Sequence, residues 1–139
     1  MPLEITSDEL KDLSGRIRKA HKAAHKLMAL DLWGNIRKNS PVDHGRLAGS
    51  WQLETDGLLS RVTTNVEYAL VQDQGSQPYE IYPANGRALK FSFGGKMIYA
   101  KSVSHPGVPG SQYVDKSIEA TNGRIEELVN RSLSAEGLV

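Results

Sequence analysis

The sequence contains no cysteine, and this absence removes several kinds of chemistry at once. It excludes disulfide cross-links, thiolate metal sites and cysteine nucleophiles. Because structural disulfides are typical of oxidising compartments, a chain without cysteine fits a reducing interior.

An excess of charge of one sign is also lacking. Lysine and arginine number 17 and the acids 16, so the formal net charge is +1, without the global basic field of nucleic-acid-binding proteins. No apolar run approaches the roughly 18 residues of a membrane span, and Met1–Glu4 shows no signal-peptide pattern. We therefore expect a soluble protein of intracellular type without a membrane partner. The length of 139 residues predicts one domain spanning 1–139.

Residues 7–39 carry the periodicity of one long helix. Ser7 is the predicted N-cap, followed by two acids where the helix dipole favours them. Apolar residues recur every three or four positions and form one stripe: Leu10, Leu13, Ile17, Ala20, Ala24 and Leu27. The opposite side carries a basic ridge, which consists of Arg18, Lys19, Lys22 and Lys26.

The apolar stripe breaks in the middle of this helix. Asp31 falls where the stripe would continue, whereas the distal face, made of Leu32, Trp33 and Ile36, lies well round the helix. Two explanations are open. Either the helix kinks near residues 29–31, or its distal part packs on a different neighbour.

The middle and end of the chain predict strands and then a second helix. The expected strands cover 51–55, 58–66, 80–83, 88–93 and 97–103, with a short helix within 66–74. Asp56-Gly57 and Gly94-Gly95 are typical hairpin turns. Residues 111–133 form a second amphipathic helix, and 134–139 a flexible tail. The fold class is therefore α+β: a long N-terminal helix, a mostly antiparallel sheet of four to five strands, and a C-terminal helix packed on one face.

Enzymatic chemistry is weakly indicated. His105 follows a strand, but no nucleophile elbow or acid–base pair accompanies it, and a general base needs an oriented partner. His21 and His25 lie one helical turn apart without an evident third metal ligand. We interpret these histidines as structural or solvent-facing and expect no enzymatic activity, metal or cofactor.

Nucleic-acid binding stays open as an alternative. The basic ridge could meet phosphates or an acidic protein surface, or it could be an ordinary solvated face. The G-x-x-G pattern at 107–110 contains a proline and follows a strand, which favours a loop over a nucleotide clamp.

Four short blocks follow one another along most of the chain. The first is 40–50, which reads Ser-Pro-Val-Asp-x-Gly-x-Leu-x-x-Ser; the second is 65–75, with Tyr-Ala and a final glycine. The third is 81–91, and the fourth begins with His-Pro-Gly at 105–107 and leads into the last helix. In this order they resemble the motifs of the HK97 gp10-like family of phage proteins. Two departures are His44, where the family usually has threonine, and Gln74, where it has an acid.

This resemblance implies a structural virion protein rather than an enzyme. Such proteins are tail-completion or neck proteins, which form rings, commonly of six subunits, at the head–tail junction. The resemblance implies partners in the tail tube protein and the head-completion (stopper) protein, passage of DNA, and assembly in the host cytoplasm. A head-side connector or minor tail component is the alternative in the same class. A small nucleic-acid-binding protein that uses the basic ridge is the alternative of another class.

The two apolar faces of the first helix predict where a ring contact would lie. A closed ring needs a heterologous interface, so one face packs on its own sheet and the other on a neighbour. In a single subunit, the distal face should then be more exposed than Leu13, Ile17 and Leu27. The predicted subunit or partner contacts are Leu32, Trp33, Ile36, Asp43, His44, Arg46, Gln74, Tyr79 and His105. The predicted contacts to DNA or an acidic partner are Arg18, Lys19, Lys22 and Lys26.

Overall fold

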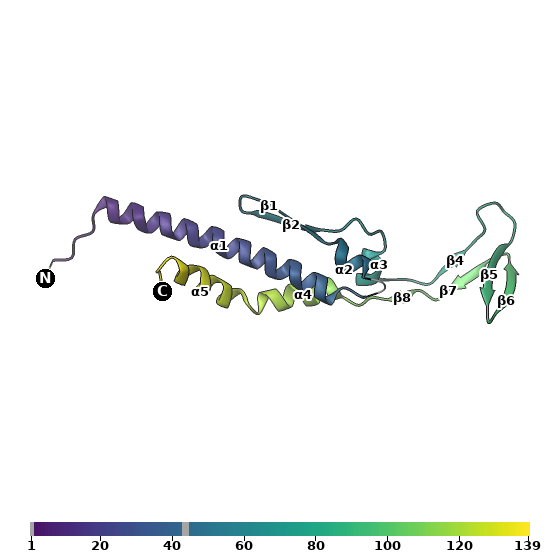
Figure 1. Cartoon of the computed structure of the whole chain (residues 1–139). Helices are drawn as coiled ribbons and strands as arrows, with labels where there is room; N and C mark the ends of the chain where they lie inside the picture. The colour runs from purple at the N-terminus through teal and green to yellow at the C-terminus, as the bar shows by residue number, and fades with distance from the viewer. Residues whose placement is uncertain (1, 43–44) are drawn as a thin grey trace. The chain divides into compact units, whose positions relative to one another are not determined.

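The structure, a computed structural model, describes residues 2–42 and 45–139 and divides the chain into two compact units (Figure 1). Unit 1 comprises residues 1–67 and 113–139, and unit 2 comprises residues 68–112. Among the described residues, no helix is both long and apolar enough to cross a membrane.

Unit 1 is built on α1, a continuous helix from Ser7 to Asn39, as predicted. Its cap is Thr6, one residue earlier than expected. The Glu9 amide donates to Thr6 Oγ1 at 3.2 Å, and the Thr6 amide donates to the Glu9 carboxylate at 2.7 Å. This capping box satisfies two amide groups that the helix itself cannot. Because α1 runs without interruption through residues 29–31, the other explanation for the broken stripe applies, namely a second neighbour.

The C-terminal segment forms two helices where one was predicted over 111–133. These are α4, Tyr113–Asn122, and α5, Ile125–Ala135. The break lies at Gly123 and Arg124. The Arg124 amide donates to the Thr121 carbonyl, only three residues back, at 2.9 Å. This tighter turn redirects the chain, so that α5 is a separate helix.

Both helices lie along one side of α1 and run antiparallel to it (Figure 1). Toward the end of α1, Asn39 Nδ2 donates to Ser117 Oγ at 3.1 Å. Toward its start, Arg16 donates to the Glu136 carbonyl at 2.9 Å and 2.6 Å. The first turns of α1 therefore extend beyond the end of α5.

A second layer of unit 1 lies on the other side of α1 (Figure 1). It consists of α2, β1 and β2, which span Arg46–Ser50, Gln52–Asp56 and Leu59–Thr63. Trp33 Nε1 donates to the Trp51 carbonyl at 2.9 Å, and His25 Nε2 lies 2.8 Å from Ser60 Oγ. β1 and β2 form the predicted hairpin, and Gly57 takes a φ of 60° in its turn.

The core of unit 1 is thin and lies where α1 meets these two layers. Its buried apolar side chains are Ala20, Ala24, Ala29, Ile36, Leu47, Val66, Tyr113 and Leu128. Three of the four that α1 contributes are alanines. Small side chains allow close helix packing, but each buries little apolar area and so stabilises the fold less than a leucine would.

Unit 2 begins with the short helix α3, Ala69–Gln74, and continues as a nested series of strand pairs. The pairs are β3 with β8 (Gly75–Ser76 and Val108–Pro109), β4 with β7 (Tyr79–Ile81 and Val103–His105), and β5 with β6 (Leu89–Phe93 and Lys96–Ala100). All three pairs are antiparallel. Gly94 and Gly95, at φ of 57° and 78°, close the predicted β5–β6 hairpin.

The α+β class is confirmed, and the strand arrangement is a finding of its own. Instead of one sheet of four to five strands, the described strands form four separate two-stranded sheets. In unit 2 the pairs are nested: β5 and β6 are joined by their own turn, whereas β4–β7 and then β3–β8 join segments that are progressively farther apart in the chain. Among the described strands, the outer edges of each pair have no further strand partner.

Candidate interaction surfaces

A row of exposed apolar side chains marks the first half of α1. This N-terminal stripe consists of Leu10, Leu13 and Ile17, which are 55%, 42% and 51% exposed. Ile36 of the distal face is only 4% exposed, and Leu32 and Trp33 are half-buried. The predicted order of exposure is therefore wrong.

The reason for the reversal is the second neighbour of α1. The distal face packs on α2 and the β1–β2 hairpin of the same unit, as the Trp33 hydrogen bond to Trp51 shows. In the N-terminal stripe, by contrast, Leu10 and Leu13 lie on the turns of α1 that extend beyond α5, and Ile17 borders the end of α5. A signal for this was present in the sequence: the first helix was predicted to be 10 residues longer than the second, 33 against 23, so an antiparallel partner could not cover it.

Next to the N-terminal stripe, toward the middle of α1, a small hollow lies between α1 and α5. The hollow measures about 250 Å³, and its lining residues are Ile17, Ala20, His21, Ala24, Met28, Val129 and Leu133. The apolar surface thus extends from this hollow, which α5 partly covers, to the first turns of α1, which α5 does not cover.

Further along the same side of α1, the stripe becomes polar, which explains Asp31. Asp31 Oδ2 accepts from Asn35 Nδ2 and from Thr121 Oγ1, each at 3.0 Å, and Oδ1 forms an ion pair with Arg124. The Asp31 side chain is only 10% exposed. Hydrogen bonding to Glu127, and then attraction to Asp31, raises the pKa of the Arg124 guanidinium, and the same hydrogen bond lowers the pKa of Glu127. The polar cluster therefore fastens α4 and the start of α5 to α1.

The basic ridge is fully on the surface. Its four cations are exposed, and within the described residues no carboxylate lies within ion-pair distance of any of them. No acid occurs between residues 13 and 30, whereas four acids precede this range, at positions 4, 8, 9 and 12. The first helix is thus acidic at its start and basic in its next turns.

Ser40 and Trp51, at the two ends of the corner between α1 and β1, are hydrogen-bonded to each other and contact the core. Ser40 Oγ donates to the Ile36 carbonyl at 2.6 Å and accepts from Trp51 Nε1 at 3.0 Å. The Trp51 ring meets the buried Tyr113 ring edge-on, with centroids 6.3 Å apart. The first and fourth sequence blocks therefore meet inside unit 1. Of the predicted contacts in this corner, Arg46 is exposed, and Asp43 and His44 lie outside the described residues.

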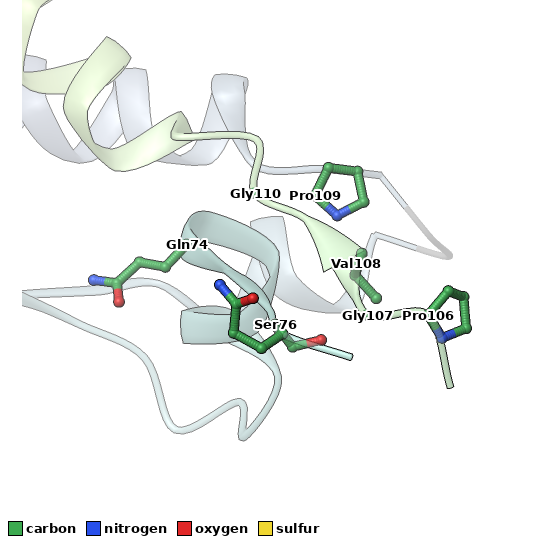
Figure 2. Close-up of a pocket in the computed structure, with 8 residues that line it drawn as sticks. Gln74, Ser76, Pro106, Gly107, Val108, Pro109 and Gly110 are labelled. Atoms are coloured by element: carbon green, nitrogen blue, oxygen red, sulfur yellow. The ribbon is translucent and has the colours of Figure 1, made fainter. Parts of the chain in front are cut away.

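The second and fourth blocks meet inside unit 2, where glycines are required. A Cβ on Gly75 would lie 2.3 Å from the Val108 carbonyl oxygen, and one on Gly107 would lie 2.3 Å from the Ser76 carbonyl oxygen. Figure 2 shows Gly107 to Gly110 running past Ser76, beside an open hollow of about 360 Å³. The G-x-x-G segment is therefore in close contact with its own unit. Gln74, a predicted contact, is exposed here.

His105 and Tyr79, two further predicted contacts, pack against each other. Their rings stack with centroids 4.8 Å apart, and His105 Nδ1 accepts from the Gly107 amide at 3.1 Å. Glu80 and Ser104 form a hydrogen bond one register position away. Successive side chains along a strand point to opposite faces of the sheet, so the Glu80–Ser104 bond lies on the face opposite the His105 ring. Ser104 and His105 are therefore not placed as a serine–histidine catalytic pair.

The remaining histidines are placed separately. His25 meets Ser60, and His21 borders the α1–α5 hollow. Within residues 2–42 and 45–139, no group of three or more His, Asp or Glu side chains is arranged to hold a metal ion.

Comparison with known proteins gives one match. A family model described as "Bacteriophage HK97-gp10, putative tail-component" matches residues 6–75, half of the chain. The matched range covers α1, the corner, the β1–β2 hairpin and α3, and it contains the first two sequence blocks. No curated protein and no solved structure matches the chain.

Proposed function

Because the chain belongs to the HK97-gp10-like family of bacteriophage tail components, we propose that it is a tail-completion, or neck, protein of a tailed phage. In this role it forms a ring, of six subunits, at the head–tail junction. The ring caps the tail tube, joins it to the head-completion protein and lets DNA pass. It acts by assembly and not by catalysis.

The observation that carries the assembly role is the N-terminal stripe. Leu10, Leu13 and Ile17 present large apolar side chains to water in the single subunit. Contiguous exposed apolar surface of this kind marks a protein interface. Packing it against a neighbour would remove it from water, at roughly 1.5–3 kcal/mol for each fully covered side chain.

The charges of α1 favour a second copy of the chain as that neighbour. The acids at positions 8, 9 and 12 of α1, together with Glu4 just before the helix, precede the basic ridge. The acidic start of one subunit is thus complementary to the basic ridge of the next. A contact between two different patches of the same chain is heterologous, and it closes into a ring when the rotation between subunits allows.

The proposal is tested in the virion. Mass spectrometry of purified particles should detect the chain, and cryo-electron microscopy should place it at the neck. Phage that lack it should accumulate DNA-filled heads and separate tails, and the chain supplied in trans should restore joining. Particles that carry no copies and join normally would overturn the proposal.

The nucleic-acid alternative has one supporting observation, the exposure of all four cations of the basic ridge. In the ring described above, these cations face an acidic segment of the neighbour instead. Neutralising Lys22 and Lys26 separates the two uses, because a ring contact would weaken assembly whereas a DNA contact would weaken DNA binding.

A further inference from the structure

The charge of the chain is unevenly distributed, and its most one-sided segment lies in unit 2. Between Glu80 and Asp115 there is no acidic residue, while Arg87, Lys90, Lys96 and Lys101 all fall in this stretch. The segment therefore carries +4, and since the whole chain carries +1, the remaining residues carry −3. All four cations are exposed.

The β5–β6 hairpin displays exposed rings beside these cations. Tyr99 is 64% exposed and Phe93 is 72% exposed. Lys90 lies directly across the pair from Tyr99, with its Nζ 5.9 Å from the ring centroid. At the base of the hairpin, Tyr82, Arg87 and Lys101 line a hollow of about 560 Å³. Aromatic and cationic groups thus share one continuous stretch of the unit.

We propose that the β5–β6 hairpin, with the hollow at its base, binds the phosphate backbone of DNA. Lys90 and Tyr99 project from one face of the pair, whereas Phe93 and Lys96, which are register partners, project from the other face, so each face offers one ring and one cation. Among the described strands, neither outer edge of the pair has a further partner, and a two-stranded ribbon fits the major groove of a duplex.

The aromatic side chains favour nucleic acid over an acidic protein surface. Exposed rings next to cations can stack on bases, which an acidic protein does not offer. The site is distinct from the basic ridge, which lies on α1 in unit 1, and it does not depend on the ring proposed above.

Fluorescence anisotropy with the full chain tests this site, with one arm using a 20-bp duplex and the other a 20-nucleotide single strand. Three phosphate contacts, from Arg87, Lys90 and Lys101, predict a salt slope near −2.7 for the duplex, hence about 40-fold weaker binding at 200 mM than at 50 mM salt. The double variant R87Q/K101Q should reduce this slope by about 2. Stronger loss with Tyr99→Leu in the single-strand arm would identify base stacking.

The matched control is K38Q/K116Q, which removes the same charge from exposed positions of unit 1 outside the basic ridge and should leave the slope unchanged. Circular dichroism of each variant verifies that the fold is kept. Absence of binding to either DNA at 50 mM salt would overturn the proposal. So would equal binding by R87Q/K101Q and the unmodified chain, or binding of polyglutamate in preference to DNA.

Discussion

Gly107 lies where one added carbon atom has no room. Its φ of 82° already disfavours any residue with a Cβ, and that Cβ would lie 2.3 Å from a backbone oxygen and 2.9 Å from a backbone carbon. Backbone atoms cannot move aside as the end of a flexible side chain can. The glycine of the His-Pro-Gly block is therefore explained by the close approach of two backbone segments.

Gly107→Ala should thus loosen the β3–β8 pair. Gly86 offers a matched control, because it has a φ of 67° but open space around its position. We expect Gly86→Ala to cost about 1 kcal/mol from backbone strain alone, and Gly107→Ala to cost clearly more. Hydrogen exchange of the amides of Ser111 and Gln112, measured in both variants, reports the difference. Equal protection in the two would contradict the role assigned to the contact.

At the scale of elements, the joint between α1 and α4 depends on a buried polar cluster. Asp31 accepts hydrogen bonds from Asn35 and Thr121 and pairs with Arg124. Asp31→Asn should destabilise the fold by about 1–2 kcal/mol, because hydrogen bonds to a charged group contribute more than neutral ones. Chemical denaturation measures this free energy.

Asp12→Asn is the matched control for that experiment. The Asp12 side chain is 73% exposed and lies 3.9 Å from Arg16, a surface pair that contributes little. If both substitutions have the same small effect, the polar cluster is not what holds the joint.

Elements with strong local signals could be predicted from the sequence. The capped, periodic helix at 7–39 and the hairpins at Asp56-Gly57 and Gly94-Gly95 are examples, because caps, periodicity and turn glycines are encoded within a few residues. The break at Gly123 was not predicted, since the apolar pattern continues across it. The division of the strands into four separate pairs was not predicted, because the sequence pattern of a strand does not determine which other strand it pairs with.

The candidate surface was predicted only in part. That α1 has two apolar faces followed from its periodicity, but which face is free depends on where α2 and α5 pack. Those are contacts between segments far apart in the chain. Asp31 shows the same limit: its pattern broke the stripe, and only Thr121 and Arg124, about 90 residues later, explain why.

At the scale of the whole molecule, assembly is the property to measure. Replacing Leu13 and Ile17 by glutamine removes two of the three apolar side chains of the N-terminal stripe while keeping good helix formers. We expect the unmodified chain to form a ring and this variant to stay monomeric, as measured by light scattering coupled to size exclusion. Loss of the apolar contact, rather than of the helix, is the physical reason, and circular dichroism separates the two.

Leu58 and Leu59 provide the control for that variant. They are 49% and 51% exposed, which is similar to the exposure of Leu13 and Ile17, but they lie in the β1–β2 hairpin. Their double glutamine variant should assemble normally. If it fails to assemble as the stripe variant does, general surface hydrophobicity and not the stripe drives association.

The nested strand pairs of unit 2 have a kinetic consequence for unit 1. Each pair encloses the next, so the unit can close like a zipper from the Gly94-Gly95 turn outward, with every step a short loop. In the last step the Ser111 amide donates to the Gln72 carbonyl at 3.0 Å, and the Gln112 amide donates to the Asp73 carbonyl at 2.9 Å. Residues 67 and 113 are then held near each other before α4 reaches α1. If unit 2 did not hold these ends together, closing the loop of residues 68–112 would oppose folding by about 3 kcal/mol of chain entropy.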